Sequence, residues 1–258
     1  MKKAVLVVSF GTSYHDTREK TINAVEKKIE KAFEGYDFFR AYTSNMIINK
    51  LKKRDGIEID NPIQAMDRLY EMGYTEVAVQ TLHIICGIEY NKLKDQISSY
   101  TDRFEKITFG NPLLYGIEDY KNTVEAIKSG AGFDGENTVV LMGHGTEHES
   151  HSAYPALEYY LRDAGVDAYV GTVEGYPEID QVVKRLKERN VKKVNLVPFM
   201  LVAGDHAQND MAGDEEDSWK SILNEEGIET EIYLNGLGEN PKIQDIFVKN
   251  AVEADTLQ

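Results

Sequence analysis

The feature that most constrains the fold is an internal repeat, in which the two halves of the chain carry similar patterns. The stretch VLVVSFGT, from Val5 to Thr12, aligns with VVLMGHGT, from Val139 to Thr146, at an offset of 134 residues. EVAVQTLHIICGIEY, which begins at Glu76, aligns with KVNLVPFMLVAGDHA, which begins at Lys193, at an offset of 117 residues. Because charged and glycine positions match as well as apolar ones, the pattern predicts two copies of one supersecondary unit.

Short apolar runs alternate with charged, helix-periodic segments in both halves. The apolar runs are VLVVSF, DFFRAYT and EVAVQTLHI in the first half, and TVVLMGH, DAYVGTV and KVNLVPFML in the second. The segments with helical periodicity include residues 16–33, 61–72, 89–106 and 178–188. Continuous apolar strands of this kind are typical of parallel sheets whose two faces are covered by helices. The predicted fold class is therefore α/β, with two similar lobes that each contain a mainly parallel sheet flanked by helices.

A glycine-rich passage, SGAGFDGEN at residues 129–137, separates the two halves and is the expected boundary. We predict an N-terminal lobe over residues 1–128 and a C-terminal lobe over residues 129–258, with the last helix packing on the first lobe. A chain of 258 residues is long enough for two domains of this size.

Charge and composition exclude several classes of partner. The chain has 29 basic and 44 acidic side chains, so its formal net charge is −15 and it has no global basic footprint for nucleic acid. No uncharged apolar stretch approaches the roughly 20 residues that span a bilayer, and the N-terminal apolar run is better explained as a strand than as a signal peptide. The single cysteine, Cys86, cannot form an internal disulfide. These features predict a cytoplasmic protein that binds neither nucleic acid nor membrane.

Three side chains in the second half follow consecutive predicted strands. His144 lies in the sequence GHG, Glu174 in GTVEGYP and His206 in LVAGDH, each at or just beyond a strand. Because the carboxyl ends of parallel strands meet at one edge of a sheet, these side chains are expected to lie close together. Two imidazoles and a carboxylate are suitable ligands for a divalent transition metal and leave positions open for substrate. A structural, hydrogen-bonded histidine is the alternative at each single position.

Other motifs point away from familiar chemistry. His148 and His151 follow in HGTEHESH, but their spacing is one residue short of the HExxH zinc motif, so a solvated loop is preferred. The glycines of GAGFDG precede a strand instead of following one, which argues against a dinucleotide fingerprint. The chain has no GxxxxGK[ST] phosphate loop, so a reaction driven by ATP or another nucleotide is not expected.

In the first half, Phe10 occupies the position that corresponds to His144, and Glu89 corresponds to His206. A carboxylate at Glu89 could hold a proton or contact the metal, or it could be an ordinary surface residue. His83 lies in an apolar run, where it is either a core histidine or, if it reaches the end of the strand, a residue of the site. Cys86 beside it is interpreted as a small apolar residue.

These motifs together resemble the class II tetrapyrrole chelatases, and among them the sirohydrochlorin cobalt chelatases of anaerobic cobalamin synthesis. The resemblance covers almost the whole chain and is carried by five segments. They are VVSFGTSY with Thr17 and Arg18, HIICGIEY, MGHGTEH, GTVEGYP and PFMLVAGDHAQNDMAG. It implies two α/β lobes that enclose a cleft, and metal ligands at His144, Glu174 and His206.

The resemblance further implies ATP-independent insertion of divalent cobalt into sirohydrochlorin or precorrin-2, with cobalt as a substrate. His144 and His206 would position the metal, and one of them would accept a pyrrole proton, with Glu89 or water taking the second. Because the macrocycle carries several carboxylates and the chain is acidic, local cations must hold it. We expect substrate contacts from Arg18, together with His83 and Phe10, and the family suggests a homo-oligomer.

Three alternatives stay open at this point. An iron or nickel chelatase would use the same ligands, because ligand type alone does not select cobalt. A tetrapyrrole or metal carrier would bind without exchanging the ion. A sugar-phosphate or nucleotide-binding α/β protein is disfavoured because glycine-rich phosphate loops are missing.

Overall fold

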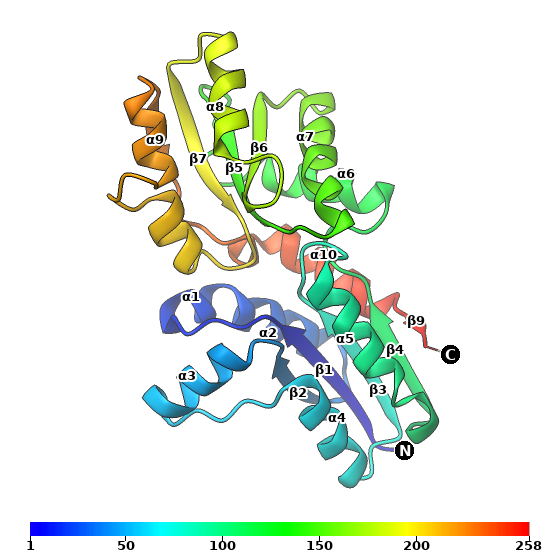
Figure 1. The fold of residues 1–258 in the computed structure, drawn as a ribbon. Helices are drawn as coiled ribbons and strands as arrows, with labels where there is room; N and C mark the ends of the chain where they lie inside the picture. The colour runs from blue at the N-terminus through cyan, green and yellow to red at the C-terminus, as the bar shows by residue number, and fades with distance from the viewer. Residues whose placement is uncertain (258) are drawn as a thin grey trace. The chain divides into compact units, whose positions relative to one another are not determined.

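The chain forms two compact α/β units in a computed structural model that describes residues 1–257 (Figure 1). One unit comprises Met1–Tyr115 together with the C-terminal residues from Gln244 onward, and the other comprises Gly116–Ile243. The glycine-rich passage at residues 129–137 lies within the second unit, between its first helix and its first strand. No helix within the described residues has both the length and the apolar composition needed to cross a bilayer.

The first unit contains a five-stranded sheet in the order β2-β1-β3-β4-β9, in which only β9 is antiparallel. Its strands are β1 (Lys3–Ser9), β2 (Asp37–Tyr42), β3 (Glu76–Thr81), β4 (Lys106–Gly110) and β9 (Asp255–Thr256). Its helices are α1 (His15–Lys20), α2 (Ile22–Ala32), α3 (Asn45–Asp55), α4 (Pro62–Glu71) and α5 (Ile88–Ser98). Helix α10 (Pro241–Val252) runs from the second unit into the first.

Both faces of the first sheet are covered by apolar helix faces. Leu6 on strand β1 belongs to a core cluster with Leu69 of α4 and Leu93 of α5, and all three are fully buried. Ile22 and Ile29 of helix α2 are also fully buried. A strand buried on both sides needs apolar residues at successive positions, which accounts for the run AVLVV in β1.

The second unit repeats this arrangement with an all-parallel sheet in the order β6-β5-β7-β8. Its strands are β5 (Thr138–Gly145), β6 (Ala168–Glu174), β7 (Lys193–Phe199) and β8 (Glu229–Ile232). Its helices include α6 (Ile117–Ile127), α7 (Ala153–Asp163), α8 (Ile179–Glu188) and α9 (Trp219–Glu225). The order matches β2-β1-β3-β4 of the first unit, so the predicted α/β fold with two similar, mainly parallel lobes is confirmed.

The matching glutamines of the repeat begin equivalent helices. Gln64 forms a capping box with Asn61 at the start of α4, and its side chain accepts the Asn61 N–H at 3.0 Å. Gln181 forms the same box with Glu178 at the start of α8, at 2.8 Å. Each reciprocal pair satisfies backbone groups that the first turn of a helix would leave unpaired. The repeat therefore preserves helix starts as well as apolar strands.

Two helical details differ from the sequence prediction. The segment predicted as one helix over residues 16–33 is two helices, which meet at Thr21, where ψ is −86° and the hydroxyl donates to the Thr17 carbonyl at 2.5 Å. Helix α3 was not predicted, although Ser44 caps its start and Gly56 ends it in a left-handed conformation, with φ at 67°. Ser and Gly at these positions are the usual signals for a helix start and end.

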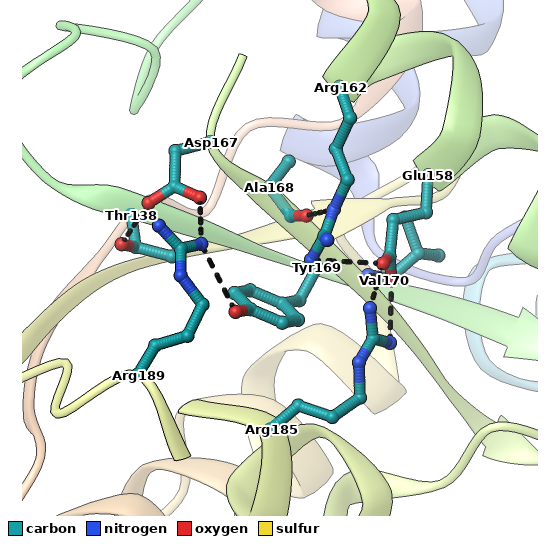
Figure 2. Close-up of polar contacts among 9 residues, drawn as sticks. All are labelled: Thr138, Glu158, Arg162, Asp167, Ala168, Tyr169, Val170, Arg185 and Arg189. Atoms are coloured by element: carbon teal, nitrogen blue, oxygen red, sulfur yellow. Dashed lines mark hydrogen bonds and ion pairs between the residues drawn. The ribbon is translucent and has the colours of Figure 1, made fainter. Parts of the chain in front are cut away.

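Strand β6 is an edge strand whose outer backbone groups are covered by side chains of α7 (Figure 2). The Glu158 carboxylate accepts the Val170 N–H at 2.9 Å, and the Arg162 Nε–H donates to the Ala168 carbonyl at 3.1 Å. An uncovered edge of this kind would pair with other chains. The side chains thus complete the hydrogen bonding that a further strand would otherwise supply.

Tyr169, in the middle of the same strand, is buried among guanidinium groups. The groups of Arg162 and Arg185 lie 4.6 and 4.7 Å from its ring centre, and Arg185 is bound to Glu158 (Figure 2). Stacked and paired in this way, the arginines join α7 and α8 across β6. Because β6 ends in Glu174, this network fixes the strand that carries one predicted ligand.

The Glu158→Ala variant is expected to lose about 2–4 kcal/mol of unfolding free energy, because it leaves a buried N–H and a guanidinium without their acceptor. Urea unfolding followed by circular dichroism measures this loss. Glu188→Ala, an exposed position on α8, is the control and should stay within about 0.5 kcal/mol of wild type. Equal stabilities of the two variants would show that the edge network is unimportant.

Candidate metal site

His144 is exposed at the carboxyl end of β5, and the glycines on both sides of it lie in close contacts. A Cβ at Gly143 would lie 2.3 Å from the ring of Tyr154, and one at Gly145 would lie 1.7 Å from the carbonyl oxygen of Glu174. Gly145 has φ at +85° and donates its N–H to the Tyr154 hydroxyl at 3.1 Å. Only glycine fits both positions, so the GHG motif fixes the backbone beneath the imidazole.

Glu174 is the exposed last residue of β6, and its backbone pairs in register with Gly145. The next residue, Gly175, has φ at +86°, and a Cβ there would lie 2.4 Å from the carbonyl oxygen of Thr146. The ends of β5 and β6 therefore approach more closely than residues with side chains allow. The backbones that carry the first two predicted ligands are direct neighbours.

His206 follows β7 and is half-buried in a helical turn that runs directly into the π-helix η3 (Ala207–Met211). Single π-turns are rare and are frequent at functional sites. Ala207 and Met211 are fully buried, so this turn is anchored in the core of the second unit. His206 is thereby held beside the sheet edge while its ring stays accessible.

The structure brings the two predicted histidine ligands together. The ring centres of His144 and His206 are 4.8 Å apart, with their planes at 90°. Two imidazoles bound to one ion at about 2.1 Å, with an angle of about 100° between them, would have their ring centres about 5 Å apart. The observed separation is therefore compatible with two neighbouring ligands of a single ion.

Hydrogen bonds select the same ring nitrogen on both histidines. The His144 Nδ1 lies 3.2 Å from the Gly145 carbonyl oxygen, and the His206 Nδ1 lies 2.5 Å from a carboxylate oxygen of Asp210. A carbonyl only accepts hydrogen bonds, and a carboxylate accepts when ionised, so each Nδ1 carries the proton. The Nε2 lone pair of each ring is then available for a metal ion.

Asp210 was not predicted as a site residue. The signal for it is its spacing, because a carboxylate four residues after a histidine lies on the same side of a helical turn. Carboxylates that accept from the second nitrogen of a metal-binding histidine commonly orient the ring and raise its basicity.

Glu174 is not assembled with the two imidazoles. Within residues 1–257, the structure contains no group of three or more His, Cys, Asp or Glu side chains placed to hold a metal ion. The Glu174 carboxylate is exposed at the edge of the sheet, and its backbone is the register partner of the residue after His144.

The predicted first-half residues occupy the corresponding edge of the first sheet. Phe10 follows β1 directly and is 48% exposed. Glu89 is half-buried in the first turn of α5, in the wall of a hollow of about 160 Å³ that Thr43, Asn61 and Lys92 also line. The hollow is made by the first unit alone and is mainly polar in its lining.

His83 lies two residues beyond the end of β3, so it is not inside the strand and the alternative in which it reaches the strand end is the nearer one. Its Nδ1 lies 2.5 Å from the Thr81 hydroxyl, and its Nε2 is buried and has no hydrogen-bond partner among the described residues. Burial lowers the pKa of His83 to about 4, because the charged imidazolium would lose its hydration. The ring is therefore neutral at physiological pH.

His148 and His151 make local hydrogen bonds, as the loop interpretation predicts. The His148 Nδ1 accepts the Ser150 N–H at 3.1 Å and so caps a 3₁₀ turn at Glu149–Ser152. The His151 Nδ1 lies 3.2 Å from the carbonyl oxygen of His148. These bonds order the loop that follows His144.

Gly145→Ala is expected to lose more stability than a typical alanine substitution at positive φ, because it adds a backbone clash with Glu174 to the conformational strain. We expect a loss of about 3 kcal/mol or more in urea unfolding. Gly165→Ala is the matched control, since Gly165 has φ at +78° with nothing within 4 Å of its Cβ position. It should lose only about 1–2 kcal/mol. Equal losses would mean that the close approach of β5 and β6 is not restrictive.

Comparisons with known proteins agree with this architecture. The family model described as cobalt chelatase (CbiK) matches residues 3–255. A sirohydrochlorin cobaltochelatase of Salmonella typhimurium is 47% identical over 255 residues, which are 98% of this chain and 97% of the relative. The sirohydrochlorin cobaltochelatase CbiKC of Nitratidesulfovibrio vulgaris is 33% identical over 261 residues, covering 98% of this chain and 90% of the relative.

Among solved structures, SirB from Bacillus subtilis with Fe3+ has a TM-score of 0.65 and 15% identity, and covers 98% of this chain and 95% of its own. A multi-domain protein of Deinococcus radiodurans with structural similarity to chelatases has a TM-score of 0.63 and 14% identity, and covers 99% of this chain and 57% of its own. At these identities the two structures support the fold alone. With a family model that spans nearly every residue and relatives of matching length, the chain belongs to the cobalt chelatase (CbiK) family.

Proposed function

We propose that this protein is a sirohydrochlorin cobaltochelatase, which inserts divalent cobalt into sirohydrochlorin without ATP in the cytoplasm. The observation that carries the proposal is the pair formed by His144 and His206, whose rings are 4.8 Å apart at the edge of the sheet. In a member of the cobalt chelatase family, two imidazoles with free Nε2 atoms are the natural place to receive the incoming ion. Assembly as a homo-oligomer stays a prediction of the family resemblance.

The reaction requires an open metal site with a reversible hold. Two pyrrole N–H protons leave the macrocycle while a divalent ion moves from protein ligands to four ring nitrogens, so charge is conserved without a nucleotide. A closed site with four protein ligands would retain the ion. Two imidazoles with one carboxylate leave coordination positions through which the ring nitrogens can enter.

The proposed roles follow from the hydrogen bonding. His144 and His206 hold the ion through Nε2, Glu174 supplies the third ligand after its rotamer changes, and Asp210 keeps the proton of His206 on Nδ1. A lone pair cannot bind metal and proton together. One imidazole therefore accepts a pyrrole proton only after it has released the ion, and Glu89 or water takes the other proton.

The remaining residues are assigned to the macrocycle. His83 stays neutral at physiological pH because its pKa is about 4, so it suits a substrate contact better than proton storage. Phe10 offers an exposed ring that can lie against the tetrapyrrole. Arg18 would contact the macrocycle as a cation.

Anaerobic absorbance spectroscopy with sirohydrochlorin and divalent cobalt tests the proposal. We expect wild type to form cobalt-sirohydrochlorin well above the spontaneous rate, and His144→Ala and His206→Ala to lose about 100-fold or more of that rate. His148→Ala is the control and should retain activity, since His148 has a local capping role.

Two outcomes would contradict the proposal. A wild-type rate equal to the spontaneous rate with cobalt, nickel and iron would favour a carrier. Faster insertion of nickel or iron than of cobalt would show that the protein is a nickel or iron chelatase instead.

Removing the Asp210 carboxylate should weaken the metal site without removing a ligand. Asp210→Ala is expected to lower cobalt affinity about 10- to 100-fold, because the His206 ring is no longer held in one tautomer and orientation. Cobalt titration by absorbance measures the affinity. Glu216→Gln, which removes an exposed charge nearby in the sequence, should bind cobalt as wild type does, and a similar loss in both variants would indicate a general charge effect.

A further inference from the structure

Arg18 is a buried cation on helix α1, although its sequence context is compatible with a solvated helix residue. It is only 6% exposed, and its Nε is fully buried and has no hydrogen-bond acceptor within residues 1–257. A buried charge is costly unless it is paired and hydrogen-bonded. The position therefore calls for an anion.

The nearby carboxylates are already paired with other arginines. Glu26 is buried and binds Arg40, and Asp55 binds Arg54 at 2.7 Å. The pKa of the Asp55 carboxyl is lowered mainly by its hydrogen bond to Arg54 and, to a smaller extent, by the charge of Arg18. Arg18 is therefore near this carboxylate. Within residues 1–257, Arg18 forms no ion pair with a carboxylate of its own. Arg18 therefore shares the Glu26 and Asp55 carboxylates at longer range with Arg40 and Arg54, and has no carboxylate bound to it alone.

Two buried hydroxyls lie at the adjoining strand ends, and neither has an acceptor for its proton among the described residues; the Arg18 guanidinium lies within hydrogen-bonding reach of the Tyr42 oxygen. They are Ser9 Oγ at the end of β1 and Tyr42 Oη at the end of β2, and the two residues are paired in register. Both side chains are almost fully buried. Burial raises the pKa of Tyr42 to about 12, so the phenol stays a neutral hydrogen-bond donor. A guanidinium and two hydroxyls form a set of donors that an oxygen anion can satisfy.

The position of this group in the fold suits a ligand. It lies at the carboxyl ends of neighbouring parallel strands, where α/β sheets bind their ligands. The segment from Phe10 to Arg18 begins at the repeat position that corresponds to His144. The second unit carries His144 at the carboxyl edge of its sheet. The first unit carries the Arg18 group at the equivalent edge of its own sheet.

We propose that Arg18, with the hydroxyls of Ser9 and Tyr42, binds a carboxylate substituent of the tetrapyrrole substrate. The proposal rests on the proposed function and assigns one residue group to substrate recognition. The chain carries a net charge of −15, which disfavours a polycarboxylate at long range, so a buried guanidinium whose Nε has no acceptor gives the substrate a specific attachment point. The free protein then tolerates a buried N–H without an acceptor, which the substrate supplies.

Titration of metal-free sirohydrochlorin, followed by absorbance, tests this assignment with the full-length protein. Arg18→Met should bind the free acid about 10- to 100-fold more weakly, the loss expected for one charge-assisted contact. Arg18→Lys should recover part of the affinity. Lys20→Met, an exposed cation on the same helix, should bind as wild type does. The fully methyl-esterified macrocycle, in the same detergent-containing buffer, should bind wild type and Arg18→Met equally weakly.

The thermal unfolding midpoint of the ligand-free variants separates recognition from structure. Because Arg18 has no carboxylate of its own, Arg18→Met should unfold at the wild-type temperature or above it. A lower midpoint with an unchanged preference for the acid over the ester would overturn the proposal and make Arg18 a structural residue. Wild-type affinity of Arg18→Met for the free acid would overturn it as well.

Two further measurements distinguish this inference from the proposed function. In cobalt insertion, Arg18→Met should raise KM with little change in kcat, whereas failure of the proposed function would leave wild type without turnover whatever its affinity for the macrocycle. Acetate and inorganic phosphate at millimolar concentration should compete only weakly with sirohydrochlorin. If they bind through Arg18 as tightly as the macrocycle does, the group is a general anion site and the assignment to substrate is wrong.

Discussion

The close approach of the ends of β5 and β6 is the constraint on which the proposed metal site depends. Gly145 and Glu174 pair in register, and a Cβ on Gly145 would lie 1.7 Å from the Glu174 carbonyl oxygen. Such a contact is available only to glycine, and it holds two consecutive strand ends at a separation that side chains would prevent. His144 is then presented beside β7, whose following turn brings His206 to it. The parallel order of the strands places all three at one edge.

A backbone group orients one imidazole and a side chain orients the other. For His144 the acceptor of the Nδ1 proton is a backbone carbonyl, and for His206 it is the Asp210 carboxylate. Both arrangements leave Nε2 as the free nitrogen, so two different local structures prepare the two proposed ligands in the same way. A site that must release its ion benefits from two neutral imidazoles. A full set of anionic ligands would occupy every coordination position and retain the divalent ion.

Most of the fold could be predicted because the relevant signals are local in sequence. The capping glutamines Gln64 and Gln181, the apolar strands and the offset between the halves reflect backbone and burial requirements that act within one element. The break at Thr21 was missed because the helical periodicity continues through it. His83 was placed inside a strand because its apolar neighbours continue past the point where β3 ends.

The site was predictable only in part for a related reason. His144 and His206 follow strands, and the meeting of parallel strand ends can be anticipated. Arg18 lies near Tyr42 and Asp55, which are distant from it in sequence, so no local pattern separates it from an exposed helix residue. The spacing of motifs places Glu174 at the same sheet edge but does not determine where its carboxylate points, and the structure does not assemble it with the two imidazoles.

X-ray absorption spectroscopy of the cobalt-loaded protein tests the central claim most directly, because it counts the imidazoles bound to the ion. The account predicts two histidine nitrogens at about 2.1 Å in wild type and one in each of the His144→Ala and His206→Ala variants. Coordination that stays the same in both variants would contradict it, and the cobalt site would then have to lie elsewhere in the chain.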